Sequence, residues 1–152
     1  MQGRQGAAAT AGCGHARYRP GVKTPILRVH HVAIICSDYQ RSRAFYIETL
    51  GLAVVSETFR AERCSHKLNL ALPDGSQLEL FTFPESPSRP TRPEACGLRH
   101  LALAVADLDA AMRVLEARGV SFEPVRVDEL TGRRFTFFQD PDGLPIEFYE
   151  AE

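Results

Sequence analysis

The chain has 152 residues, of which 44% are hydrophobic and 24% are charged, and its formal net charge is −1. This length and composition are typical of one soluble globular domain. The near-neutral charge gives no electrostatic basis for binding nucleic acid or a membrane surface, and no apolar run approaches the roughly 20 residues of a membrane span. We therefore expect neither nucleic acid nor a membrane as a partner.

Residues 1–25 differ in composition from the rest of the chain, being rich in Gly, Ala, Gln and Arg and free of acidic residues. The apolar stretch from Ala7 to Ala11 is too short for a secretory signal. We expect a disordered tail here, with an organelle transit peptide as the alternative. The cysteines form no Cys-x-x-Cys pair, which favours reduced thiols and a cytoplasmic location (Cys13, Cys36, Cys64 and Cys96).

Residues 26–83 have the pattern of a strand, a helix and three further strands. The helix is expected from Tyr39 to Leu50, with Ser37 or Asp38 as its N-cap and Gly51 at its end. Pro73-Asp74-Gly75 predicts a hairpin turn between the last two strands. The strands are expected at residues 26–36, 53–59, 66–72 and 76–83.

Residues 84–97 carry a proline at every third position (Pro84, Pro87, Pro90 and Pro93). This spacing matches the three-residue turn of a polyproline II helix and predicts an extended, semi-rigid linker. Residues 98–150 then repeat the earlier order of elements. A helix is expected from Asp107 or Asp109 to Arg118, and strands are expected at residues 98–105, 121–127, 134–139 and 144–149.

The two halves are copies of one unit. The run HVAIICSD that starts at His31 returns as HLALAVAD at His100, and the run PDGSQLELF that contains Glu79 returns as PDGLPIEFY around Glu147. Each copy therefore begins with a histidine and ends with a glutamate at nearly the same separation. This self-similarity predicts two βαβββ modules, residues 26–83 and 98–150, within a single domain of residues 26–150.

The alternation of side chains along a strand predicts where these four residues point. In the strand that follows His100, the large apolar residues at every second position are expected to pack on a helix, and the histidine shares the other face with small residues. In the closing strand Ile146 and Phe148 are expected to pack inward, which leaves Glu147 on the opposite face. The first copy has the same pattern, so all four residues are expected on the faces away from the helices.

Two imidazoles and two carboxylates suit a borderline divalent ion such as Zn, Ni, Co, Fe(II) or Mn. Glu79 and Glu147 are each flanked by large apolar residues, and burying two carboxylates together without a cation would cost several kcal/mol. We therefore expect one divalent metal ion per site, bound by His31, Glu79, His100 and Glu147. His30, next to His31, is interpreted as a flanking residue. His66 and its counterpart Arg134 are interpreted as surface residues of their strands, with contact to a substrate as the alternative.

These motifs resemble the vicinal oxygen chelate superfamily, which contains glyoxalase I, extradiol dioxygenases and fosfomycin or bleomycin resistance proteins. The resemblance covers residues 27–150. It is carried by HHVAI from His30, Gly51-Leu52, GLRHLA from Gly97, and FQDPDG from Phe138 followed by Ile146-Glu147. It implies an α+β fold in which paired βαβββ modules form a cup-shaped mixed β-sheet around a metal.

Within this superfamily the ligand order His, Glu, His, Glu is most similar to glyoxalase I of the bacterial type, a lactoylglutathione lyase. The resemblance then implies a metal-dependent lyase or isomerase that acts on an α-hydroxycarbonyl or a thiol hemithioacetal through a metal-stabilised enediolate. It assigns Glu147 as the base that moves the proton, with Glu79 as its pseudo-symmetric counterpart. A homodimer is the default expectation, and the metal site lies either within one chain or across the dimer.

The chain departs from glyoxalase I relatives at Ile35, where they carry an arginine that holds a glutathione carboxylate. Arg133 and Arg134 are alternative candidates for an anion site. Two other functions stay open: another metal-dependent enzyme of the superfamily, such as a dioxygenase or a thiol transferase, or a small-molecule-binding resistance protein without catalysis.

Overall fold

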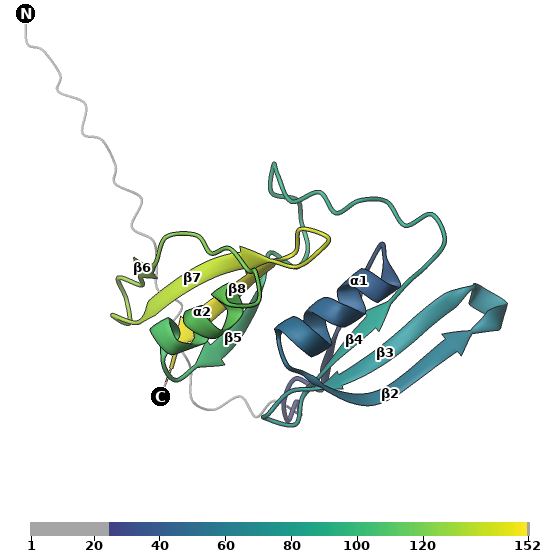
Figure 1. Cartoon of the computed structure of the whole chain (residues 1–152), viewed down its shortest axis with the longest axis horizontal. Coiled ribbons are helices and arrows are strands. Elements are labelled where there is room, and N and C mark those ends of the chain that lie inside the picture. The colour runs from purple at the N-terminus through teal and green to yellow at the C-terminus, as the bar shows by residue number, and fades with distance from the viewer. Residues whose placement is uncertain (1–24, 152) are drawn as a thin grey trace, which may run out of the picture.

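A computed structural model describes residues 25–151. The expected tail therefore lies outside the described residues, apart from residue 25. Each half of the chain folds into a four-stranded mixed sheet with one main helix, and the two modules lie side by side (Figure 1). This arrangement confirms the α+β fold built from paired βαβββ units. Within one chain the two sheets are separate. None of the described helices is long and apolar enough to cross a membrane.

Module one contains β1 (His31–Ile35), α1 (Tyr39–Ala44), β2 (Ala53–Arg60), β3 (Ser65–Ala71) and β4 (Gln77–Phe81), in the sheet order β1-β4-β3-β2. Asp38 caps α1 by accepting a hydrogen bond from the Arg41 backbone N–H at 3.0 Å. The helix continues as a π-helical turn, η1 (Phe45–Thr49), and a short 3-10 turn, η2 (Ala61–Arg63), joins β2 to β3. The first strand begins at His31 rather than at residue 26.

Module two contains β5 (Leu101–Val105), α2 (Leu108–Glu116), β6 (Arg126–Val127), β7 (Arg134–Gln139) and β8 (Pro145–Glu150), in the sheet order β5-β8-β7-β6. Asp107 caps α2 through a hydrogen bond from the Ala110 N–H at 2.8 Å. The strand expected at residues 121–127 is reduced to β6. Upstream of β6, Glu123 still pairs with the neighbouring strand, because its N–H donates to the Phe137 carbonyl at 2.8 Å.

The core lies between each sheet and its helix. In module one it contains four fully buried leucines from β3 and β4, Leu68, Leu70, Leu78 and Leu80. In module two Phe138, Ile146 and Phe148 form the sheet side, and Leu108 and Leu115 form the helix side. Burying apolar surface in this way is the main favourable contribution to folding.

Contacts between the modules join α1 to the turn between β7 and β8. Asp140 accepts hydrogen bonds from the buried Tyr46 hydroxyl at 3.0 Å and from the Leu144 N–H at 2.8 Å. Asp142 accepts one from the Ser37 N–H at 2.9 Å, and Arg41 donates to the Pro141 carbonyl at 2.9 Å. Burial raises the pKa of Asp140 above its ordinary value despite these hydrogen bonds. The turn motif of module two therefore holds the modules together.

The connection between β4 and β5 contains turns at residues 84–85 and 91–94, with residues 86–90 free of turns between them. Figure 1 shows this segment looping away from both sheets. At its second turn the Thr91 hydroxyl donates to the Gly143 carbonyl at 3.1 Å. The segment therefore contacts the same β7–β8 turn that contacts α1.

Candidate metal centre

Each sheet has one face covered by its helix and one face away from it, which we call the open face. In β4 the buried Leu78 and Leu80 alternate with Glu79, and in β1 the buried Ile34 alternates with the exposed His31 and Ile35. The register sets Ala33 opposite Glu79 in module one and Ala102 opposite Glu147 in module two. Small neighbours thus leave room around each glutamate, as the alternation in the sequence predicts.

The first pair of candidate ligands lies on the open face of module one. The Nε2 atom of His31 is 3.8 Å from Oε2 of Glu79. The other oxygen of Glu79 accepts from Lys67 Nζ at 2.9 Å and from Asn69 Nδ2 at 3.0 Å. Burial alone would raise the pKa of Glu79. The hydrogen bond and charge of Lys67, the charge of His31 and the hydrogen bond of Asn69 together outweigh burial, so the pKa lies below its ordinary value.

The second pair lies on the open face of module two. The Nε2 atom of His100 is 3.1 Å from Oε2 of Glu147. The His100 ring packs edge-on against Phe137, with ring centroids 5.3 Å apart. Among the described residues, His100 is the only hydrogen-bonding or ion-pair partner of the Glu147 side chain. Glu147 is therefore held less firmly than Glu79.

The two pairs do not meet within one chain. In the part of the chain that the structure describes, no three side chains of His, Cys, Asp or Glu lie close enough to hold a metal ion together. The side chains of Glu79 and Glu147 are each only 12% exposed, whereas those of His31 and His100 are 43% and 35% exposed. Each open face thus presents a half-site of one imidazole and one carboxylate.

The donors of each half-site fit a divalent metal ion. Nδ1 of His30 lies 2.9 Å from Nδ1 of His31, so a hydrogen bond occupies that nitrogen and leaves Nε2 directed at Glu79. A hydrogen bond to the second ring nitrogen is the usual way in which proteins orient a metal-binding histidine. Two such half-sites together supply the two nitrogen and two carboxylate ligands of a borderline divalent ion.

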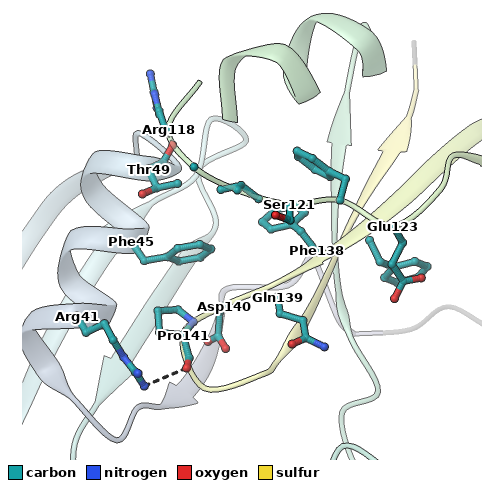
Figure 2. A pocket seen from close by; sticks show the side chains of 14 residues that line it. Arg41, Phe45, Thr49, Arg118, Ser121, Glu123, Phe138, Gln139, Asp140 and Pro141 are labelled. Carbon is teal, nitrogen blue, oxygen red and sulfur yellow. Dashed lines mark hydrogen bonds between the residues drawn. The ribbon is translucent and has the colours of Figure 1, made fainter. Parts of the chain in front are cut away.

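A cavity of about 590 Å³ lies elsewhere, between α1 and module two. In Figure 2 Phe45 and Arg41 extend from the helix toward Phe138, Asp140 and Pro141 of module two. None of the four candidate ligands lines this cavity. It belongs to the packing of the modules rather than to the candidate metal centre.

Neither His66 nor Arg134 faces the candidate ligands, which gives no support to the alternative that they contact a substrate. His66 stacks on Tyr39 of α1, with ring centroids 4.1 Å apart, and so faces the helix. Arg134 forms two hydrogen bonds, at 2.6 and 3.0 Å, with Asp109 of α2. Both side chains lie on the covered faces, because β3 and β7 place them in alternation with residues of the open faces.

Sequence reasoning missed Lys67 and Asn69, which contact Glu79 directly, and treated His30 as a flanking residue although it contacts His31. A signal for the first two was present. The hairpin turn at Pro73-Asp74-Gly75 sets the register of β3 against β4, and this register places Asn69 opposite Glu79. No comparable signal identified His30, because the orientation of a side chain just before a strand does not follow from alternation.

Two βαβββ modules, each with a histidine and a glutamate on its open face, are repeated within this chain. Residues 28–148 match the family model of the Glyoxalase/Bleomycin resistance protein/Dioxygenase superfamily, and the chain belongs to this family. Proteins of this family bind small molecules, often hold a divalent metal ion and often form dimers.

The chain is similar to several individual members of this family. The protein YwkD of Bacillus subtilis is 57% identical over 122 residues, which cover 80% of this chain and 95% of YwkD. The crystal structure of a glyoxalase family protein from Enterococcus faecalis has a TM-score of 0.76 at 46% identity, covering 81% of this chain and 97% of that one. A 2-epi-5-epi-valiolone epimerase of an Actinomyces species is 29% identical, covering 78% of this chain and 76% of the epimerase.

Proposed function

We propose that the chain is the subunit of a metal-dependent, glyoxalase I-like lyase or isomerase that acts on an α-hydroxycarbonyl or a thiol hemithioacetal. The observation that carries the proposal is the repeated pair of one imidazole and one nearly buried carboxylate on the open face of each module. The relative named as an epimerase supports it, because epimerisation is an isomerisation and leaves the substrate without net oxidation.

His31, Glu79, His100 and Glu147 would hold the metal ion, which would act as a Lewis acid on the oxygens next to the reacting carbon. Lys67 and Asn69 fix one oxygen of Glu79, which suits a permanent ligand. Glu147 lacks such partners among the described residues and is the better candidate for the base that takes a proton from the carbon beside the carbonyl and returns it one atom along. The apolar ring of Phe137 beside His100 helps to exclude water.

The complete centre, in this proposal, needs a second copy of the chain. The open face of module one in one copy meets the open face of module two in the other, so that a twofold-symmetric dimer has two sites. An exposed apolar side chain on the open face of module one supports this pairing, because Ile35 is 56% exposed in the single chain. The separation of the two half-sites within one chain supports it as well.

Metal loading and turnover test the activity together. The metal-free protein is reloaded with Ni, Co, Zn, Mn or Fe(II), and its metal content is measured beside the thiol-dependent isomerisation of methylglyoxal. We expect one metal ion per chain and turnover that Glu147→Gln abolishes. Stoichiometric metal without turnover would reject the hemithioacetal substrate, and absence of metal binding would reject the enzyme and leave a binding protein.

Mixing two inactive variants tests the shared site. One variant carries His31→Ala and Glu79→Ala, and the other carries His100→Ala and Glu147→Ala. When the two are refolded together, a mixed dimer has one intact site if the sites span the interface. Random pairing then returns about one quarter of the wild-type activity. A site formed within one chain would return none, since no chain in the mixture keeps all four ligands.

A further inference from the structure

Two cations, Arg60 and Lys67, lie on the open face of module one, and Lys67 forms an ion pair with Glu79. Arg60 closes β2 opposite Ser65, and Lys67 lies opposite Thr58 on β2 and Phe81 on β4. The Phe81 ring is next to both, because the Arg60 guanidinium carbon lies 4.9 Å and Lys67 Nζ 5.5 Å from its centroid. Lys67 therefore lies between the Phe81 ring, on which Arg60 stacks, and the carboxylate of Glu79.

The Arg60 guanidinium has donors without acceptors. It lies over the rings of Phe81 and Phe83, and its Nη2 donates to the Ser65 hydroxyl at 2.6 Å. Its Nε atom is buried and has no hydrogen-bond partner. No carboxylate of the described residues forms an ion pair with Arg60. A buried donor on a cation that lacks a counter-ion is unfavourable, so this arrangement indicates a missing acceptor.

Module two shows the same stacking with the counter-ion present. Arg126 lies over Phe135 and Phe137 on the open face of that module, at 5.5 and 5.2 Å. Its guanidinium forms an ion pair with Glu123. An arginine stacked on two aromatic rings thus occurs in both modules, and only the one in module one lacks an acid among the described residues. The difference points to a ligand that supplies the negative charge.

We propose that Arg60 and Lys67 form an anion subsite that binds a carboxylate or phosphate group carried by the substrate. This inference rests on the proposed function, and it narrows the substrate class to α-hydroxycarbonyl compounds with an anionic group. The planar guanidinium suits an anion with two oxygens, which would accept hydrogen bonds from its terminal N–H groups. The Phe81 ring forms the floor of the subsite, and Lys67 places the bound anion next to the half-site of Glu79.

Matched pairs of small ligands test the subsite by binding alone. Dihydroxyacetone phosphate is compared with dihydroxyacetone, and hydroxypyruvate with hydroxyacetone, in NMR titrations of the full chain in metal-free and zinc-loaded form. We expect the anionic member of at least one pair to bind about tenfold more tightly or better, with a preference that weakens as salt is added. The two pairs distinguish a phosphate from a carboxylate. Equal affinity within both pairs would overturn the proposal.

Substitutions locate the effect. Arg60→Gln removes the charge but keeps a polar side chain, and we expect it to abolish the preference for the anionic ligand while leaving the affinity for the neutral one unchanged. Arg60→Lys is expected to restore part of the preference. Arg126→Gln, at the stacked arginine of module two, is the matched control and should bind all four ligands as the wild type does. An undiminished preference in Arg60→Gln would contradict the assignment.

The same measurements separate this inference from the proposed enzyme activity. A preference for anions that depends on Arg60 in the metal-free chain, together with absence of turnover under every metal, would retain the subsite and reject the isomerase. Turnover of neutral and anionic substrates with equal KM, unchanged in Arg60→Gln, would reject the subsite and retain the isomerase.

Discussion

The two modules share a framework but differ in what surrounds it. Both present a histidine and a glutamate on an open face, at equivalent places of the sheet. In module one the neighbours of the glutamate are the polar side chains of Lys67 and Asn69, and in module two the facing residue is Phe137. A site formed by one open face of each kind has a polar, cationic wall and an aromatic wall.

This difference explains how a duplicated unit can give its two glutamates separate roles. Duplication alone supplies two equivalent ligands, which would have equal basicity and equal mobility. Hydrogen bonds from Lys67 and Asn69 fix Glu79, and the contacts of module two leave Glu147 with His100 alone among the described residues. Catalytic roles are distinguished by such environments rather than by residue type.

The largest expected effect is on kcat, when each of the two glutamates is replaced by glutamine. Glu147→Gln should lower kcat by about a hundred- to ten-thousand-fold at saturating metal, because the amide cannot accept the proton. Glu79→Gln should mainly weaken metal binding, with kcat largely recovered when metal is added in excess. Steady-state kinetics across a metal titration, with bound metal measured by mass spectrometry, distinguishes the two outcomes.

The opposite result would reverse the assignment. If Glu79→Gln stays inactive at saturating metal while Glu147→Gln recovers, Glu79 is the base and the hydrogen bonds of Lys67 and Asn69 position it for catalysis. Gln77→Ala, on the open face of module one but not among the proposed ligands, is a control that should keep kcat within a few-fold of the wild type.

The repeated framework was readable from the sequence because it depends on local rules. Alternation of apolar residues around Glu79 and Glu147 predicted which face each occupies, and Asp38 and Asp107 were identified among the candidate caps of the two helices. The turn motifs predicted the hairpins. These features do not depend on how the modules pack, so the pattern of residues in a single sequence is sufficient to predict them.

The surroundings of the framework were not readable in the same way. The ion pair of Arg134 with Asp109 depends on how α2 lies on its sheet, and the stacking of Arg60 on Phe83 depends on the twist of the edge strand and on the chain just beyond β4. The separation of the two half-sites depends on the contacts of Asp140 and Asp142 with α1. Tertiary packing determines these arrangements, and they cannot be predicted from the periodicity of residues in the sequence.

The next effect concerns stability and compares two aspartates that brace corresponding turns. Asp140 accepts from the N–H groups of Asp142 and Leu144 and from buried Tyr46. Among the described residues, Asp74 accepts from the N–H and hydroxyl of Ser76 alone, in an exposed turn. Asp140→Ala should lower the free energy of unfolding by about 3 kcal/mol, because it leaves several buried donors unpaired.

Asp74→Ala is the matched control and should change stability less, since Asp74 itself is exposed and Ser76 is its one hydrogen-bonding residue among those described. Urea unfolding of both variants measures the difference. Equal losses would mean that the contact of Asp140 with Tyr46 adds nothing, and that the modules are held together by the apolar contacts of α1 instead. Tyr46→Phe, which removes only the hydroxyl, would then also be close to neutral.

The smallest effect is expected at the two turn glycines, and here the modules should behave alike. Gly75 and Gly143 have φ values of +81° and +77°, a region that disfavours side chains. A Cβ atom at either position would meet its nearest neighbour at an ordinary distance, 3.8 Å from Arg28 and 3.9 Å from Thr91. Substitution by alanine should therefore cost only the backbone strain, roughly 1 kcal/mol at each turn.

Those two neighbours also anchor the turns in the same way, since Arg28 donates to the Gly75 carbonyl at 2.9 Å and Thr91 donates to the Gly143 carbonyl at 3.1 Å. Both donors precede the first strand of their module, so the anchor belongs to the repeated framework. Urea unfolding of Gly75→Ala and Gly143→Ala should give equal losses. A much larger loss of unfolding free energy at Gly143 would show that the contacts between the modules restrain this turn. The contacts of module two with α1 would then also constrain the backbone of the repeated unit.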